Sequence, residues 1–519
     1  MKSFVVALLC SALAIPMYGQ TGDVPTALQV YSKLVSLDVV VTDKNGSIVT
    51  DLRKEDFEVL ENKQTQVIKN FETIQSHKLP GDAGKIVVRS STDLASIGTA
   101  PVTILVLDEM IPKFSDVAYS RQCIEQYLKL QSDVLAQPTM LLVVRSDKFM
   151  VLRDYTQDRK SLLDAIQSYK PVNPQVSGMG AGSGRRIIMT LGALEQIAKS
   201  QLGVPGRKNI IWIGKGFPAV DPTGDGISEQ ALESFKDSLQ MATDVMLRAR
   251  VALSVIAPEG LVGGGMVPTS ILSGDDTDPT ALAGVTTSGD APDQGVLSFG
   301  SLAALTGGRF IYNRNDIDQQ IESSLREGAS YYTLSYVPHS SDGNDADYRH
   351  IRVLLKRPGL YVQTRQGYYA PNAVASAKPA PTETQITEAE QKTQVADLAN
   401  AATNRMRYSA IHIESTEKAE AGGYRVYVRA ADLSWTFQDN GTFTDDASLF
   451  AVSFSAQGKA TGQSYVFIRK TLVKPPLATE NAEVVYDLPF LVSSKAARVR
   501  FVIRDERTGK LGTADQLVR

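Results

Sequence analysis

The chain has little cysteine, tryptophan and histidine for its 519 residues: two cysteines, two tryptophans and four histidines. Two cysteines cannot form the disulfide framework of a small secreted domain, so stability must come from packed apolar cores. The histidines lack the spacing of a zinc site, and we expect all four at the surface: His77, His339, His350 and His412. The formal net charge of −3 shows no basic excess, which argues against a nucleic-acid partner.

Long apolar runs are absent after the first fifteen residues. Met1-Lys2 is a short basic start, and residues 4–15 are apolar apart from Ser11. Such a run is too short to cross a bilayer, so residues 1–19 are predicted to be a signal peptide cut near Gly19. We expect an exported protein, in the periplasm, in the cell envelope or secreted, with no transmembrane segment after the signal peptide.

Motifs of catalysis are also missing. The sequence has no serine elbow, no zinc motif and no Cys/His pair of the kind that hydrolases use. The glycines of residues 173–184 lack the Gly-Lys-Ser/Thr ending of a phosphate loop. Cys123 shares a helical face with Tyr119 and Tyr127, which indicates a small buried contact rather than a nucleophile. We therefore expect no enzyme activity.

Apolar periodicity divides the rest of the chain. Residues 30–75 alternate with period two around an Asn45-Gly46 turn, which predicts a small antiparallel β module. From 101 to 337 strand and helix patterns alternate, which predicts βαβ units and a mostly parallel sheet. The predicted parts that follow are a β extension at 338–370, an Ala/Pro/Thr/Glu linker at 371–391 and a C-terminal antiparallel β-sandwich at 404–519.

Inside residues 101–337 the individual elements can be placed. We expect strands at 102–107, 140–145, 149–153, 209–213, 250–256 and 309–313. Helices are expected near 116–131, 158–168, 186–201, 228–249 and 316–328, and long loops at 173–184 and 258–297.

Several segments occur together in a fixed order: SLDVVVTDKNGSIVTDLRKEDFEVLENKQTQVI, VTILVLDEM, VPGRKNIIWIGKGFP, LTGGRFIYNRND, YYTLSYVP and TRQGYYA. As an ordered set they resemble the von Willebrand factor A-related family of exported acidobacterial proteins, over roughly residues 30 to 371. The resemblance implies a von Willebrand A-like α/β fold, a doubly wound and mostly parallel sheet wrapped by helices, with no enzyme activity. Related A domains bind protein ligands or matrix, often through a divalent ion.

The strand at 102–107 ends on Asp108, where open α/β sheets bind ligands. In metal-binding A domains this strand ends in Asp-x-Ser-x-Ser, but Met110 and Pro112 stand at the two serine positions here. Lys215 stands where the resemblance implies a further aspartate. Asp108 is thus the only retained candidate ligand, and Mg²⁺ needs a fuller oxygen shell. We expect a degenerate site without a cofactor, closed by an ion pair between Asp108 and Lys215, with weak Mg²⁺ or Ca²⁺ binding as the alternative.

The same edge offers a candidate binding surface: Asp108, Glu109, Met110, Lys215 and Phe217. An apolar group rimmed by charges is typical of a contact patch, although the N-terminal β module or the loop at 258–297 could equally cover it. The sequence favours a non-enzymatic, exported interaction or adhesion module for an unknown protein or surface polymer. The alternative is a structural or assembly scaffold of the cell envelope.

Overall fold

In a computed structural model of the protein, the chain from Leu34 to Arg519 forms one compact unit. The structure describes residues 34–80, 85–110, 114–145, 149–171, 179–217, 229–258, 298–312, 314–338, 348–369, 388–419, 422–438, 440–473 and 482–518. The predicted signal peptide, most of the loop at 258–297 and most of the linker at 371–391 lie outside these residues. Within them, no helix has both the length and the apolar character needed to cross a membrane.

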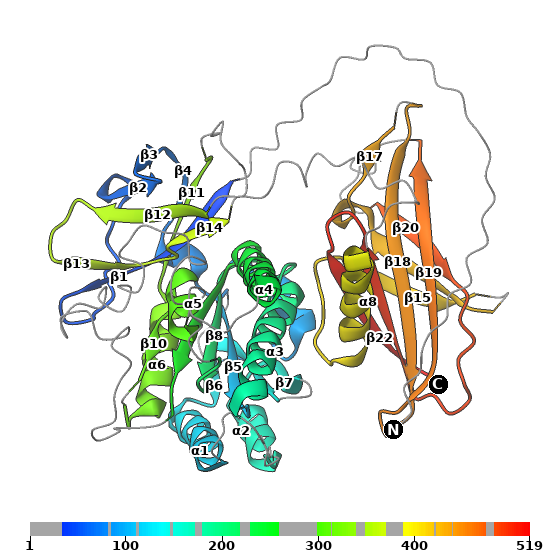
Figure 1. The fold of residues 1–519 in the computed structure, drawn as a ribbon, viewed down its shortest axis with the longest axis horizontal. Helices are drawn as coiled ribbons and strands as arrows, with labels where there is room; N and C mark the ends of the chain where they lie inside the picture. The colour runs from blue at the N-terminus through cyan, green and yellow to red at the C-terminus, as the bar shows by residue number, and fades with distance from the viewer. Residues whose placement is uncertain are drawn as a thin grey trace. The chain divides into compact units, whose positions relative to one another are not determined.

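A six-stranded sheet forms the middle of the α/β part (Figure 1). Its strand order is β10-β9-β8-β5-β6-β7, and all neighbours are parallel except the edge strand β7. The bounds are β5 (Val102–Asp108), β6 (Val134–Val144), β7 (Phe149–Asp158), β8 (Lys208–Ile213), β9 (Val251–Ile256) and β10 (Phe310–Ile311). Every residue of β5 and β8 is buried, as expected for strands covered on both faces. The predicted strands are confirmed, although β6 starts at Val134 rather than at residue 140.

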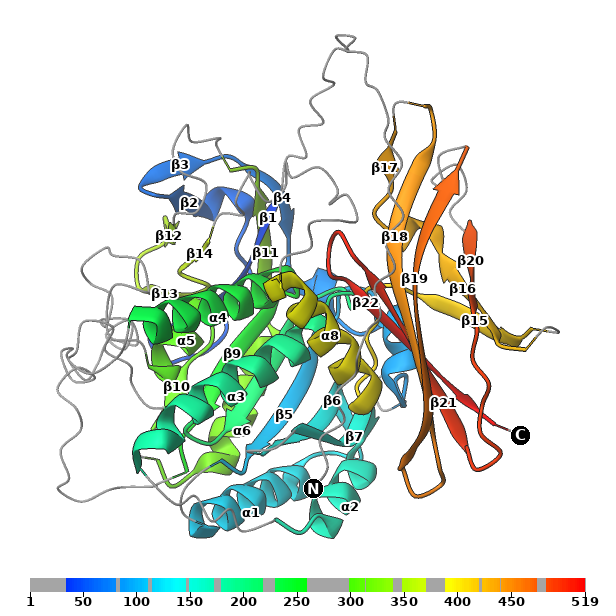
Figure 2. The same cartoon turned by 45° about the vertical axis from the view of Figure 1, so that its right-hand side comes forward.

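Helices cover both faces of this sheet (Figures 1 and 2). Alternate residues of β5 enter two separate cores: Ile104 and Val106 pack with α3, α4 and α5, whereas Leu105 and Leu107 pack with α1, α2 and α6. The bounds are α1 (Phe114–Leu130), α2 (Arg159–Ser168), α3 (Met179–Ser200), α4 (Glu229–Arg248), α5 (Phe299–Leu305) and α6 (Ile317–Ala329). The free thiol of Cys123 is buried on α1, which confirms the expectation of a small packed contact.

Two of these helices differ from expectation. The sequence predicts a loop at 173–184, yet α3 begins at Met179. Glycine costs a helix about 1 kcal/mol per residue, and the packing of the apolar residues later in α3 outweighs that cost. Helix α5 is too short to give a periodic signal and was not predicted.

The N-terminal strands pair with strands from almost 300 residues later. One sheet has the order β13-β1-β11-β4, and the other has the order β14-β12-β2-β3. The bounds are β1 (Val35–Asp43), β2 (Phe57–Glu61), β3 (Gln64–Gln66), β4 (Ile68–Glu72), β11 (Tyr332–Tyr336), β12 (Tyr348–Leu355), β13 (Leu360–Gln363) and β14 (Gly367–Tyr369). The predicted module at 30–75 and the predicted extension at 338–370 therefore share two sheets and one core. Alternation predicts which face of a strand is buried, but it does not predict the neighbouring strand.

The C-terminal part is an α-helix followed by two antiparallel sheets. Helix α8 (Glu388–Thr403) confirms the short helix that the sequence predicts near residues 386–403, overlapping the end of the predicted linker. One sheet is β15-β16-β20, and the other is β17-β18-β21-β22 with β19 on β18; one core lies between them. The bounds are β15 (Ile413–Lys418), β16 (Tyr424–Arg429), β17 (Thr436–Phe437), β18 (Phe443–Phe454), β19 (Ala460–Leu472), β20 (Glu483–Leu488), β21 (Arg498–Asp505) and β22 (Leu511–Leu517). This arrangement agrees with the predicted sandwich.

Candidate functional site

Asp108 lies at the carboxyl end of β5 and is completely buried. Its Oδ1 accepts a hydrogen bond from the backbone N–H of Met110 at 2.8 Å. Its Oδ2 accepts two, from the indole Nε1–H of Trp212 at 3.1 Å and from the backbone N–H of Gly216 at 3.0 Å. Burial raises the pKa of Asp108, and these donors oppose that rise. The carboxylate is thus held by three protein donors.

Two glycines let the segment after β8 pass directly against this carboxylate. A Cβ on Gly214 would lie 2.2 Å from the Cβ of Asp108, and Gly214 has a φ of +156°. A Cβ on Gly216 would lie 2.1 Å from the ring of Phe299, and its φ of +61° favours glycine. Side chains at either position would push the backbone donor away from Asp108. The glycines of the Gly214-Lys215-Gly216 segment therefore allow its backbone to cover the Asp108 carboxylate.

The predicted partner of Asp108 is not the one that the structure provides. Lys215 is half-buried and is not among the hydrogen-bond donors to Asp108. The donors to Asp108 are an indole and backbone amides instead. Among the described residues, no group of three or more His, Cys, Asp or Glu side chains is arranged to hold a metal ion.

The predicted binding surface lies mostly in the interior. Glu109, Met110 and Phe217 are 2%, 3% and 3% exposed. The ring of Phe217 lies 5.2 Å from that of Phe299 on α5, which in turn lies 5.2 Å from Trp212. The sequence left open whether the N-terminal β module or the loop at 258–297 covers this patch, and the helix that packs on it is α5. Glu109 lies on the other side, beside Tyr169; burial first, and then the Glu109 carboxylate, raise the pKa of Tyr169.

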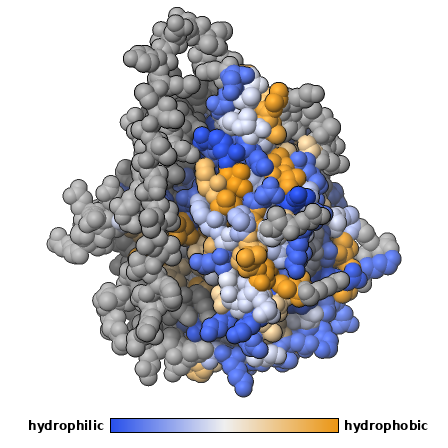
Figure 3. Space-filling model, turned by 90° about the vertical axis from the view of Figure 1, so that its right-hand side faces the viewer, coloured by the Kyte–Doolittle hydropathy of each residue, from blue (hydrophilic) through white to orange (hydrophobic). Residues whose placement is uncertain are grey.

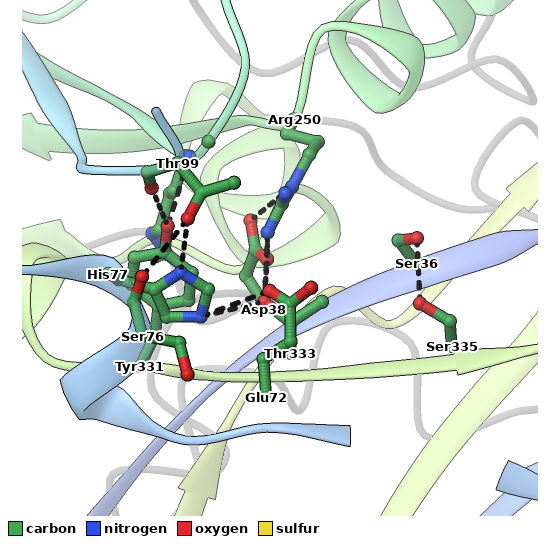
Figure 4. Close-up of polar contacts among 12 residues, drawn as sticks. Ser36, Asp38, Glu72, Ser76, His77, Thr99, Arg250, Tyr331, Thr333 and Ser335 are labelled. Carbon is green, nitrogen blue, oxygen red and sulfur yellow. Dashed lines mark hydrogen bonds and ion pairs between the residues drawn. The ribbon is translucent and has the colours of Figure 1, made fainter. Parts of the chain in front are cut away.

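A second polar cluster, which the sequence did not predict, lies where β1 and β11 meet the amino-terminal edge of the six-stranded sheet (Figure 4). Asp38 on β1 forms an ion pair with Arg250, the residue just before β9. Arg250 also donates to the hydroxyl of Thr333 at 2.9 Å. Burial alone would raise the pKa of Asp38, but the charge and hydrogen bonds of Arg250 outweigh it and lower the pKa. Arg250 holds a φ of +52°, which is uncommon for a non-glycine residue.

His77 belongs to this cluster and is 1% exposed, so the expectation that it lies at the surface is wrong. Its Nδ1 lies 3.2 Å from the hydroxyl of Thr99, and its Nε2 lies 3.1 Å from that of Thr333. The ring stacks on Tyr331 at 4.2 Å between centroids. Burial, then the charge of Arg250, lower the pKa of His77 to about 4, against the opposing charge of Asp38. His77 is therefore neutral near pH 7.

One sequence signal could have revealed this cluster. Val35, Leu37, Val39 and Val41 occupy one face of β1, so Asp38 points to the other face. A carboxylate between Leu37 and Val39, on a strand whose second face is also partly buried, requires a cation as its partner. The identity of that cation depends on the strand pairing, which the sequence does not show.

No protein-family model matches the chain, and no curated protein matches it. Among solved structures, proximal thread matrix protein 1 from the mussel byssus has 10% identity and a TM-score of 0.22, over 44% of this chain and 47% of that chain. The SpRpn10 VWA domain has 14% identity and a TM-score of 0.16, over 30% of this chain and 88% of that one. Human COPII-coat protein Sec24c has 9% identity and a TM-score of 0.22, over 58% of this chain and 47% of that one.

The chain spans about half the length of the mussel protein, and similarities at these TM-scores carry no argument about fold or function. The chain is a mixed α/β structure with a mostly parallel six-stranded sheet and several antiparallel sheets.

Proposed function

We propose that this chain is an exported, non-enzymatic interaction protein with a von Willebrand A-like α/β domain, and that it binds partner proteins through the open edge of β19. The observation that carries the proposal is the pairing of β19. This strand has thirteen residues, and among the described strands it pairs with β18 alone. A long strand with one unpaired side presents backbone N–H and C=O groups to which an extended peptide can add.

The side chains on β19 suit such an addition. Burial alternates along the strand: Val466 and Ile468 pack against the sandwich core, while Tyr465 and Phe467 are 49% and 37% exposed. Aromatic groups beside an open strand edge supply contact area at low entropic cost. Other exposed apolar side chains on the sandwich, such as Leu491 and Leu517, do not lie on this strand; Figure 3 shows that hydrophobic groups on this side of the molecule are separated by hydrophilic ones.

The closed state of Asp108 supports recognition away from the strand-end edge. A metal-dependent A domain contacts its ligand through an ion at this edge, and the ion needs free carboxylate oxygens. Both oxygens of Asp108 already accept hydrogen bonds from the protein, and the residue is completely buried. Partner binding through β19 should therefore not depend on divalent ions.

Affinity capture from envelope and culture fractions of the native host tests this proposal. The intact protein and the Leu517→Lys variant, which places a charge on the opposite edge strand β22, should retain the same partner in Mg²⁺ and in EDTA. Phe467→Lys should lose it, because a lysine at the β19 edge opposes strand addition. Equal capture by Phe467→Lys, or loss of capture in EDTA, would contradict recognition through β19.

A scaffold role is the second candidate, and one set of contacts favours it. Lys199 on α3 contacts Asp397 on α8 at 2.6 Å, and Asp397 contacts Arg504 on β21 at 3.3 Å. These three side chains are at most 11% exposed. Buried ion pairs between α3, α8 and β21 favour a fixed arrangement of these three elements, and a rigid chain is suited to a scaffold. Failure of both edge variants to retain any partner would favour this role.

A further inference from the structure

The amino-terminal edge of the six-stranded sheet contains an unusual concentration of buried positive charge. Arg207, Lys208 and Arg365 are 4%, 1% and 8% exposed, and Arg250 lies beside them. The carboxylate that acts on all three is Asp38, which already forms its ion pair with Arg250; Asp244 acts in addition on Arg365, and Glu327 on Arg207. Because burying a charge without a counter-charge is unfavourable, this group of cations favours the binding of additional negative charge.

The individual partners of these cations show where that charge is missing. Arg207 donates to the amide oxygen of Asn209 at 2.9 Å and to the carbonyl of Gly307 at 3.3 Å. Lys208 donates to two backbone carbonyls, one of them that of Gly206 at 2.8 Å. These acceptors are neutral. Among the described residues no oxygen accepts a hydrogen bond from the guanidinium of Arg365, and this residue is 8% exposed.

A small cavity lies against this guanidinium. The described residues around it include three arginines, namely Arg207, Arg250 and Arg365, together with Asp38 and Ser36. Its volume is about 10 Å³, in the measure by which a single buried water needs about 10–15 Å³. A second cavity of the same size adjoins it, with Arg365 and Thr306 lining both. A space of this size suits one species about as large as a water molecule or a small ion.

We propose that this cavity binds a single monovalent anion of chloride size between the guanidinium groups of Arg365 and Arg207. The ion adds negative charge to that of Asp38. A neutral water molecule in the same place would not. The position of the ion accounts for Arg365, whose guanidinium donates no hydrogen bond among the described residues; Arg365 follows β13 within the Thr-Arg-Gln-Gly-Tyr-Tyr segment. Burial lowers the pKa of Arg365 to about 10 and that of Lys208 to about 7, as expected for cations that lack a counter-charge.

The ion would also have a structural consequence. Arg365 belongs to the antiparallel β part, whereas Arg207 immediately precedes β8 of the six-stranded sheet. An anion between them joins the two sheet systems in the native state only. Because a ligand that binds only the native state raises the unfolding midpoint, the protein should be stabilised by chloride specifically.

Thermal unfolding of the full chain at constant ionic strength, with sodium gluconate replaced stepwise by sodium chloride, tests the proposal. The intact protein should show a midpoint that rises by a few degrees and saturates. Arg352→Met, which removes an exposed arginine from β12, should behave identically. Arg365→Met should lose the chloride response. The same chloride response in Arg365→Met, or no response in the intact protein, would overturn the proposal.

Should Arg365→Met fail to fold, the intact protein decides the matter by itself. Crystals grown with bromide in place of chloride should give an anomalous peak in the cavity between Arg365 and Arg207. Cavity density without anomalous signal would identify a water molecule and overturn the proposal. Stabilisation by sulfate as strong as that by chloride would overturn it too, because the cavity is too small for that ion.

Discussion

At the scale of single residues, two fully buried titratable groups mark opposite edges of the six-stranded sheet. Asp108 lies at the carboxyl edge and accepts three hydrogen bonds. His77 lies near the amino edge, between two threonine hydroxyls. A buried polar group with its partners in place costs little, whereas removal of one partner exposes the desolvation penalty. Substitutions at both residues therefore have defined consequences.

Substitutions around Asp108 should identify its true partner. In Asp108→Asn, an NH₂ group must face at least one N–H donor, which should cost about 1–3 kcal/mol in the free energy of unfolding. Trp212→Phe leaves one acceptor site open and should cost a similar amount. Double-mutant cycles in urea should give a clear coupling energy between Asp108→Asn and Trp212→Phe.

The control for this prediction is Lys215→Ala. Combined with Asp108→Asn it should be additive within about 0.5 kcal/mol, because the hydrogen-bond donors to Asp108 are Trp212 and two backbone amides. A large coupling energy between Lys215→Ala and Asp108→Asn would instead support the ion pair that the sequence predicts.

Protonation of His77 should destabilise the protein in mild acid. The pKa of His77 falls from 6.5 to about 4 on folding, so the unfolded chain binds more protons between these values. The stabilisation from neutral His77 is complete above pH 6.5 and is lost as the pH falls toward 4, by about 3 kcal/mol at most. Because burial raises the pKa of Asp108 and acts in the opposite direction, the comparison must be with His77→Gln.

Urea unfolding from pH 7 to pH 4 measures this difference. The free energy of unfolding of the intact protein should fall relative to that of His77→Gln across this range. Parallel pH profiles for the two proteins would mean that His77 titrates normally in the folded state.

At the scale of helices and strands, the sequence predicts the α/β part well and the site only in part. The apolar runs of β5, β8 and β9 identify buried strands without any tertiary information. The same runs place Asp108 at the end of a strand. They do not predict its partner Trp212, because that depends on the register between β5 and β8. In the structure Trp212 lies opposite Val106, which is two residues before Asp108 and on the same face of β5. Helix α5 is short and the start of α3 is rich in glycine, so neither gives a periodic signal. The sequence therefore does not predict that α5 packs against Phe217.

At the scale of the whole chain, what could not be predicted is long-range pairing. β1 pairs with β11 and β13, and β2 pairs with β12, so the predicted boundaries at 75 and 338 cut across shared sheets. Each strand pattern is compatible with many neighbours, and the choice is made by the core that the strands enclose together. The Asp38 cluster arises from this pairing, since His77, Thr333 and Arg250 come from three distant segments.

The link between the α/β part and the C-terminal sandwich should control how the chain unfolds. Lys199→Met removes the charge that Asp397 and Glu195 share, at 2.6 and 2.7 Å. Glu195 then loses its cation, whereas Asp397 keeps Arg504 at 3.3 Å, so the change should cost about 3 kcal/mol in the free energy of unfolding. Lys160→Met, which breaks an exposed pair with Asp164 on α2, should leave stability nearly unchanged.

The two tryptophans allow this loss to be located, because Trp212 lies in the six-stranded sheet and Trp435 packs against the sandwich core. In a Trp435→Phe background, fluorescence reports Trp212 alone, while far-UV circular dichroism reports the whole chain. With Lys199 present, both signals should follow one transition in urea. With Lys199→Met they should separate, because the sandwich and the α/β part no longer unfold together. Coincident transitions in the variant would show that the shared apolar contacts of α8, and not the buried ion pairs, couple the two parts.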